Sequence, residues 1–350
     1  MSVIFAILIF SFLIFVHELG HFISAKASGV QVNEFSMFMG PVIWKKTKGE
    51  TTYSLRCIPI GGFCAMEGED EETDNPRAFR KAKWWKQLII LVAGSAMNFI
   101  AGVLIMVIVF MPAKRFIVPT IAEVEQGSLV GGVNGFQAGD TVLEIDGEKI
   151  YVQSDFGTIL SLNPGDVHDI VLERNGEKVV LNDFEMKKTT FPGEEAPRYG
   201  LDFMAEKATF GSKISYAWKN VLNAGRIVRL SLQMLFSGEA GIADMSGPVG
   251  IIGQMSDVAD KSETKTDAFL NMLYFGGFIA INLAMMNMLP IPALDGGRVL
   301  ALLITTAIVK ITKKPVNPKV EGYIHGAGMI LLLLFMAVIM FKDIFTIFKG

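Results

Sequence analysis

The stretch His17-Glu18-Leu19-Gly20-His21 lies in an apolar run that begins at Met1 and continues to Phe22. On a helix the two histidines fall on one face, so both imidazoles reach a single metal ion, and Glu18 lies beside an open coordination position. This HExxH pattern is typical of zinc hydrolases, in which the metal lowers the pKa of a bound water and a carboxylate takes up its proton. We therefore predict that His17 and His21 bind Zn²⁺ and that Glu18 is the catalytic base.

The simpler interpretation of this stretch is a pair of buried histidines. Its location argues against that interpretation, because ionisable groups within a membrane span are costly and usually face a partner or a water-filled site.

The composition indicates a membrane protein. The chain has 350 residues, of which 51% are hydrophobic and 19% charged, and its mean hydropathy is +0.42. These values predict an α-helical multi-pass membrane protein. The net charge of -3 provides no basic surface for nucleic acid, so nucleic-acid binding is not expected. Cys57 and Cys64 lack metal-binding spacing, and we expect two free thiols.

Four transmembrane helices are expected, at about 2–24, 87–111, 268–289 and 324–345. The first could instead be a cleaved secretory signal. We reject this alternative because no Lys or Arg precedes the apolar run.

The connection from Lys26 to Lys86 contains ten Lys or Arg residues, which places it in the cytoplasm and the N-terminus outside. Within it, residues of about 50–66 predict a β-hairpin with a turn near Gly61 and Gly62. The residues do not decide whether this hairpin dips into the membrane or stays in the cytoplasm.

The second span contains Gly94-Ser95-Ala96-Met97-Asn98. Small residues allow another helix to approach closely, and Asn98 needs a hydrogen-bonding partner in hydrocarbon. A packing face and a role near the metal are both open.

Residues 113–206 predict a small, soluble, β-rich domain outside the cell. Alternating segments such as 141–146 (TVLEID) and 169–174 (DIVLER) precede the turn pairs Asp146-Gly147 and Asn175-Gly176. The run from Gly127 to Gly147 resembles the PDZ domain of bacterial membrane proteases. Such a domain either binds an extended peptide or acts only as a steric cover.

Residues 207–267 are expected to hold an amphipathic helix, at about 212–236, and then a polar connection. The third span ends in the sequence NMLPIPALDGG, residues 287–297. Pro290 and Pro292 should break the helix, and broken backbone at this depth suggests a cavity. If the break lies against the first span, Asp295 would be the third zinc ligand. The alternative is an Asp-Gly-Gly turn at the interface.

The order of these motifs resembles that of bacterial site-2 proteases, in particular the sigma-regulator type with one PDZ domain. The resemblance extends over essentially the whole chain, although Ser95 replaces a proline found in many relatives. It implies zinc bound by His17, His21 and Asp295, with Glu18 as base. It also implies that Asn287 and the loop at Gly61-Gly62 hold the substrate backbone, with Asn98 as a further substrate-binding candidate.

The expected function is hydrolysis within transmembrane segments of single-span substrates, such as anti-sigma factors or signal-peptide remnants, after trimming outside. The expected location is the bacterial plasma membrane, with the PDZ domain and both termini outside and the active site toward the cytoplasm. Two alternatives are a membrane zinc transporter and a non-catalytic PDZ scaffold. The sequence carries no information on the oligomeric state.

Overall fold

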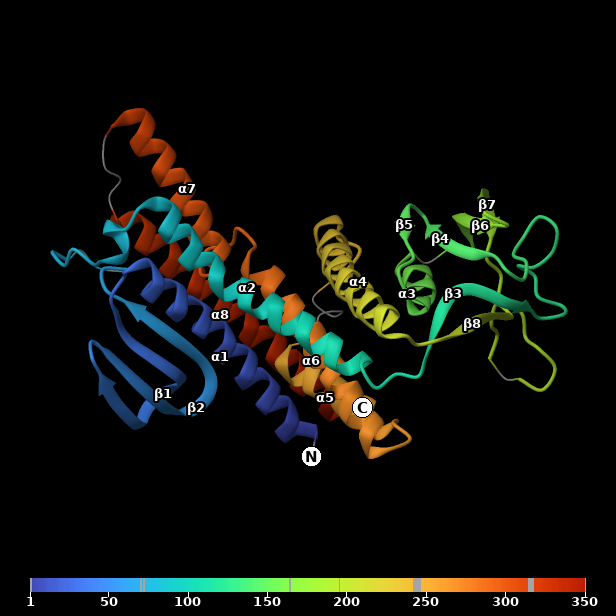
Figure 1. Cartoon of the computed structure of the whole chain (residues 1–350), viewed down its shortest axis with the longest axis horizontal. Helices are drawn as coiled ribbons and strands as arrows, with labels where there is room; N and C mark the ends of the chain where they lie inside the picture. The colour runs from blue at the N-terminus through green and yellow to red at the C-terminus, as the bar shows by residue number, and fades with distance from the viewer. Residues whose placement is uncertain are drawn as a thin grey trace. The chain divides into compact units, whose positions relative to one another are not determined.

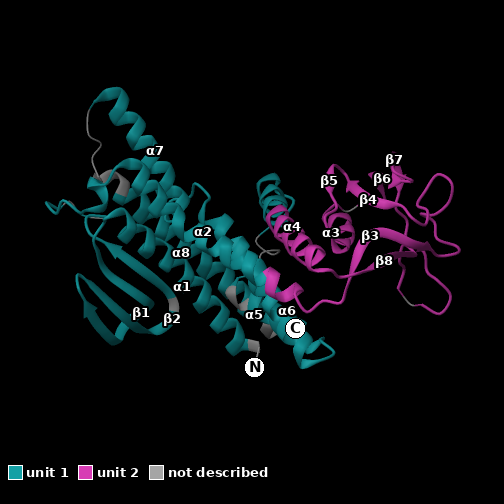
Figure 2. Ribbon diagram, in the orientation of Figure 1, with its two compact units in different colours: residues 1–105, 227–350 teal, residues 106–226 magenta. Residues whose placement is uncertain are grey.

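A computed structural model describes residues 2–69, 71, 73–163, 165–194, 196–241, 247–313 and 318–349. The chain forms two compact units, shown in different colours in Figure 2. Unit 1 consists of Met1–Ile105 and Ile227–Gly350, and unit 2 consists of Met106–Arg226.

Long apolar helices dominate unit 1 (Figure 1). They are α1 (Ser2–Ser28), α2 (Trp84–Phe110), α6 (Lys265–Asn287) and α8 (Pro318–Lys349). Within the described residues, four segments are long and apolar enough to cross a membrane: Val3–Ser28, Trp84–Phe110, Lys265–Asn287 and Gly322–Thr346. The four predicted spans correspond to these four candidate membrane-spanning helices.

Glycines bring three of these helices into close contact. A Cβ on Gly20 of α1 would lie 2.4 Å from the carbonyl oxygen of Ala93 on α2. A Cβ on Gly102 of α2 would lie 2.7 Å from Ile281 of α6. Association in a bilayer depends on packing at short distance, so side chains at these positions would separate the helices.

A two-stranded hairpin, β1 (Val32–Lys48) and β2 (Thr51–Met66), lies beside α1 (Figure 1). The segment of about 50–66 that was predicted to form a whole hairpin is thus only the second strand, β2, of a longer hairpin. The first strand escaped prediction because a glycine and a proline at 40–41 interrupt its pattern. Residues 34–37 of β1 pair with two parts of β2, with 52–55 along one edge and with 62–65 along the other. In the described residues, the segment 62–66 pairs on one side only, so its other edge is open.

The region after unit 2 is more helical than predicted. The amphipathic helix is confirmed as α4 (Phe210–Ser237). The polar connection expected up to residue 267 includes a further helix, α5 (Pro248–Asp260). A further helix, α7 (Asp295–Thr312), follows the end of the third span.

Helix α5 begins at a buried carboxylate. The backbone N–H groups of Gly247 and Gly250 both donate to Oδ2 of Asp343, at 2.9 Å each, and Asp343 lies on α8. A carboxylate at a helix N-terminus satisfies N–H groups that have no partner within the helix. Pro248 fits the first turn because it has no N–H group to satisfy.

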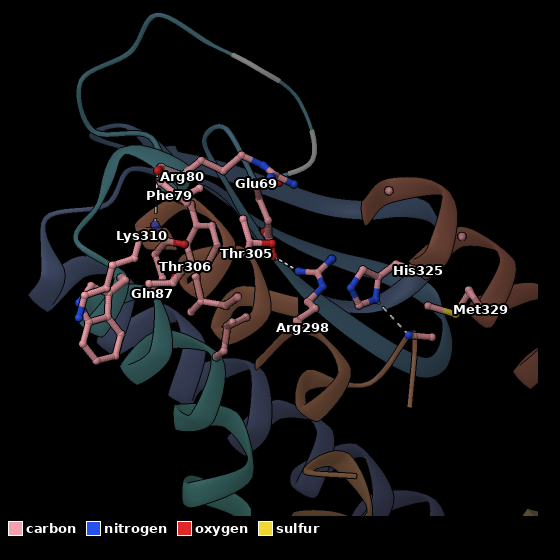
Figure 3. Close-up of a pocket in the computed structure, with 17 residues that line it drawn as sticks. Glu69, Phe79, Arg80, Gln87, Arg298, Thr305, Thr306, Lys310, His325 and Met329 are labelled. Carbon is pink, nitrogen blue, oxygen red and sulfur yellow. Dashed lines mark hydrogen bonds and ion pairs between the residues drawn. The ribbon is translucent and has the colours of Figure 1, made fainter. Parts of the chain in front are cut away.

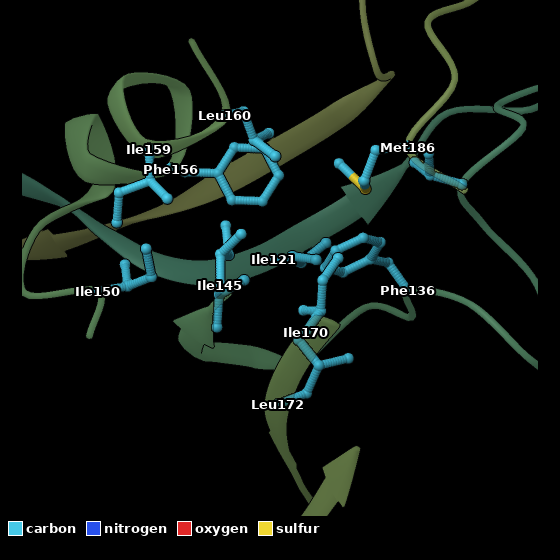
Figure 4. Close-up of a cluster of buried hydrophobic side chains, with 12 residues drawn as sticks. Ile121, Phe136, Ile145, Ile150, Phe156, Ile159, Leu160, Ile170, Leu172 and Met186 are labelled. Carbon is cyan, nitrogen blue, oxygen red and sulfur yellow. The ribbon is translucent and has the colours of Figure 1, made fainter. Parts of the chain in front are cut away.

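Unit 2 is built on an antiparallel sheet with strand order β7-β6-β4-β3-β8, with β5 pairing with β4. Twelve buried residues, including Phe136, Ile145 and Ile170, form its core (Figure 4). The φ angles are positive at Asp146 and Gly147, and at Asn175 and Gly176, as two-residue hairpin turns require. The elements are β3 (Arg115–Val124), β4 (Thr141–Ile145), β5 (Glu148–Lys149), α3 (Gln153–Leu162), β6 (Val167–Arg174), β7 (Glu177–Glu185) and β8 (Leu201–Lys207).

Unit 2 is wider than the predicted 113–206 because flanking helical residues pack with the sheet. Tyr216 of α4 stacks on Phe116 of β3, with ring centroids 4.2 Å apart. Arg226 of α4 is paired with Asp155 of α3 at 2.8 Å, and both side chains are buried. Removing one partner of such a buried pair would leave a charge without compensation, so the first part of α4 is firmly attached to unit 2.

We predict that Asp343→Ala destabilises the protein by roughly 3 kcal/mol, because two buried N–H groups lose a charged acceptor. Thermal unfolding in detergent measures this change. Asp257→Ala, at an exposed position of α5, is the control and should leave the midpoint nearly unchanged. Equal midpoints for the two variants would contradict the capping role of Asp343.

Candidate metal centre

Three ligand-type side chains converge in unit 1. His17 and His21 come from α1, and Asp295 is the first residue of α7. The Nε2 atoms of the two histidines lie 3.2 Å apart. Oδ2 of Asp295 lies 3.3 Å from Nε2 of His17 and 3.4 Å from Nε2 of His21. Among the described residues, this is the one group of three or more metal-binding side chains. The structure thus brings together the three predicted ligands.

The spacing of these atoms fits a small tetrahedral ion. Bonds of 2.0–2.1 Å from Zn²⁺ to nitrogen or oxygen place two ligand atoms about 3.3 Å apart. Oδ2 of Asp295 and Nδ1 of His17 are buried and have no hydrogen-bond partner among the described residues. Buried polar atoms are normally paired, so this buried carboxylate oxygen without a hydrogen bond fits a site that binds a cation.

His21 is oriented by the backbone of α2. Its Nδ1 lies 2.8 Å from the carbonyl oxygen of Ile90, which can only accept, so Nδ1 carries the proton. The Nε2 atom of His21 is then free to bind a metal. Sequence reasoning missed Ile90 because any residue type supplies a carbonyl oxygen.

Gly94 of α2 lies directly against both imidazoles. A Cβ at this position would lie 2.3 Å from Nε2 of His21 and 2.7 Å from Cε1 of His17. The sequence left a packing face and a role near the metal both open here, and in the structure the space beside this glycine is occupied by the imidazoles of His17 and His21. Asn98, one turn later on α2, is 1% exposed, and its Oδ1 has no partner in the described part of the chain.

The break between α6 and α7 positions Asp295. Helix α6 ends at Asn287 and α7 begins at Asp295, so the break that the two prolines predict is confirmed. Ala293 adopts a φ of +83°, an unusual conformation for a residue with a side chain. Its N–H donates to Nδ1 of His325 on α8, at 3.3 Å. His325 therefore supports the loop before Asp295.

Glu18 lies between the histidines and β2. A Cβ added to Gly62 would lie 3.2 Å from Cγ of Glu18 and 3.1 Å from the carbonyl oxygen of Ser36. The strand therefore approaches α1 closely at this point because residue 62 has no side chain. Gly61 has a φ of +74°, which favours glycine. The open edge at 62–66 thus begins beside the carboxylate.

The cysteines take no part in this cluster. Both are free: Cys57 is exposed and Cys64 is buried in β2. Burial raises the pKa of the Cys64 thiol, and the nearby Glu18 carboxylate raises it further. A protonated thiol is a poor metal ligand.

A model of peptidase family M50 matches residues 5–335. The chain belongs to peptidase family M50, the site-2 protease family. It is 34% identical over 346 residues to a Clostridium acetobutylicum protein named "Putative zinc metalloprotease", covering 98% of this chain and 97% of that one. It is 27% identical to the zinc metalloprotease RasP of Geobacillus kaustophilus, over 98% and 97% of the two chains. It is 26% identical to the regulator of sigma-W protease RasP of Bacillus subtilis, over 99% of both.

We predict that Gly94→Ala lowers the metal content of this M50 protein by roughly tenfold, because the added methyl group displaces the ligand imidazoles. Elemental analysis of the purified protein measures the metal content. Gly253→Ala is the matched control, since this helical glycine of α5 has open space where a Cβ would lie. Full metal content in the Gly94 variant would show that the rings do not depend on this contact.

Proposed function

We propose that this protein is an intramembrane zinc metalloprotease that cleaves the transmembrane segments of single-span proteins. The observation that carries this proposal is the convergence of His17, His21 and Asp295 at the broken end of a membrane-spanning helix, with Glu18 beside them. Membership of a peptidase family and the names of the relatives support zinc as the metal.

A zinc ion bound by these three side chains supplies a Lewis acid that polarises a peptide carbonyl and activates water near neutral pH. The carboxylate of Glu18 accepts a proton from the attacking water and returns it to the departing amide nitrogen. The hydrogen bond from His21 to the carbonyl oxygen of Ile90 keeps the imidazole in one tautomer throughout.

A substrate helix must unwind before its carbonyl groups are accessible, because its amides are hydrogen-bonded within the helix. The open edge of residues 62–66 offers backbone groups to which an unwound strand can pair. Gly62 lets the strand lie close to Glu18, and the positive φ of Gly61 shapes the backbone just before it. We assign Asn287, at the end of α6, and the buried Asn98 as amide groups that bind the freed backbone of the substrate.

We further propose that the hairpin side of unit 1 is cytoplasmic and that both termini are outside, because basic residues concentrate in the connection 26–86. The protein then acts in the bacterial plasma membrane. Anti-sigma factors and signal-peptide remnants are the proposed substrates. The name of the B. subtilis relative, a regulator of sigma-W protease, supports the first class.

We assign unit 2 as a PDZ domain. Its strand β8 is at the edge of the sheet, and a cavity of about 430 Å³ lies along β8 and α3, with Phe156, Gly200 and Phe203 in its lining. PDZ domains bind an extended peptide as an added strand between a sheet edge and a helix, which is the arrangement of elements here.

Glu18→Gln should reduce cleavage by about 10²–10⁴-fold while zinc stays bound, because the proton acceptor is lost but the ligands remain. Asp295→Asn should lose both zinc and activity. The assay is cleavage of a labelled transmembrane peptide in detergent, with and without chelator. A metal transporter or a PDZ scaffold would keep its activity in the Glu18 variant, and undiminished cleavage would overturn the proposal.

Asn287→Ala should lower kcat/KM by roughly tenfold, the effect of one lost hydrogen bond of about 1.4 kcal/mol to substrate, without loss of zinc. Asn271→Ala, at an exposed position of the same helix, serves as the control. The same kcat/KM in the Asn287 variant and the wild type would exclude the assigned contact.

A further inference from the structure

A cavity of about 880 Å³ lies in unit 1 between α2, α7, α8 and the segment that leads from β2 to α2 (Figure 3). The segment includes a short 3-10 helix, Phe79–Lys81. The function proposed above does not use this cavity, although Ala293 and Arg298, on either side of Asp295 in the chain, belong to its lining.

The polar part of the cavity is cationic. Its lining includes three basic side chains, Arg80, Arg298 and Lys310, and the acidic Glu69. Arg298 forms an ion pair with Glu69. Lys310 is exposed, and the hydroxyl-bearing Thr305 and Thr306 lie one turn before it on α7. This group of side chains is suited to an anionic group with several oxygen acceptors.

The remaining wall of the cavity is apolar and partly uncovered. Trp84, Val309 and Met329 are 50%, 41% and 45% exposed. Phe79, Leu91 and Leu302 complete this wall. A soluble anion such as inorganic phosphate would leave these side chains uncovered, whereas a molecule with a hydrocarbon chain would cover them.

The cavity opens at the depth of lipid headgroups. Trp84 and Trp85 begin the membrane-spanning helix α2, and Lys83 and Lys86 flank them. Trp and Lys residues at the end of a span mark the boundary between hydrocarbon and water. A bilayer lipid therefore presents its phosphate at the level of the cationic side chains and its acyl chain at the level of the apolar wall.

We propose that this cavity is a binding site for an anionic phospholipid of the surrounding bilayer. Its phosphate is held by Arg80 and Lys310, beside the ion pair of Arg298, and an acyl chain lies along Trp84, Leu91 and Met329. Basic pockets between transmembrane helices bind lipid headgroups in this manner. Because Arg298 is one turn after Asp295, the bound lipid contacts the helix that carries the candidate metal ligand.

The test is native mass spectrometry of the full chain, purified in detergent and mixed with equal amounts of phosphatidylglycerol and phosphatidylcholine. The wild-type protein should retain phosphatidylglycerol preferentially. Lys310→Gln should reduce this retention by about fivefold, the effect of one cation near an anionic headgroup. Lys313→Gln is the matched control, because Lys313 ends the same helix but lies outside the cavity lining.

Lys310 is exposed, so its substitution should not impair folding, and elution from a sizing column verifies this. Arg80→Gln is a second variant with the same expected direction. Equal retention of the two lipids would overturn the proposal, as would equal losses in the Lys310 and Lys313 variants. Displacement of the lipid by millimolar inorganic phosphate would also overturn it, because the ligand would then be a soluble anion.

Discussion

The close approach of α1 and α2 is the contact on which the candidate metal centre depends. Gly20 allows the backbones of the two helices to meet, and Gly94 leaves room for both imidazoles at the same crossing. The contact also brings the carbonyl oxygen of Ile90 to His21. Two imidazoles would otherwise be uncompensated polar groups in a membrane-spanning helix, at a cost of several kcal/mol. The crossing of α1 and α2 therefore both offsets the cost of placing the two histidines in a span and orients their imidazoles.

The third candidate ligand, Asp295, lies at an interruption of regular structure. A continuous helix through residues 287–295 would keep its backbone groups satisfied, but it would not place a carboxylate at a helix start facing α1. The two prolines end α6, and the unusual conformation of Ala293 lets the chain turn into α7 at Asp295. The hydrogen bond from Ala293 to His325 ties this turn to α8. Irregular backbone at membrane depth is stable here because protein surrounds it.

Buried polar groups are also satisfied by neighbouring elements at a distance from the metal centre. Asp343 would be costly in the fourth span, yet it accepts from two N–H groups at the start of α5 and so satisfies both helices. In unit 2, Asp155 does the equivalent: it accepts from backbone N–H groups at the start of α3 and pairs with Arg226. Buried carboxylates at helix starts thus attach one element to another in both units.

Local patterns were sufficient to predict several features. Four apolar segments predicted the four candidate spans, Asp146-Gly147 and Asn175-Gly176 predicted hairpin turns, and Pro290 and Pro292 predicted the helix break. The spacing of His17 and His21 placed both on one helix face. Each of these depends on residues close together in the chain, where backbone geometry leaves few alternatives.

What the sequence determined by itself was therefore the set of spans, turns and metal-binding residue types. Only the tertiary structure decided that Oδ2 of Asp295 lies 3.3 Å from Nε2 of His17 and that Gly94 lies against the imidazoles. It also decided that residues 32–37 pair with 62–66 and so leave the other edge of 62–66 open beside Glu18. It also decided that 248–260 is a helix, since its start depends on a carboxylate 93 residues or more away in the chain. Such contacts depend on how distant segments pack, and packing depends on the shapes of all the neighbouring side chains at once.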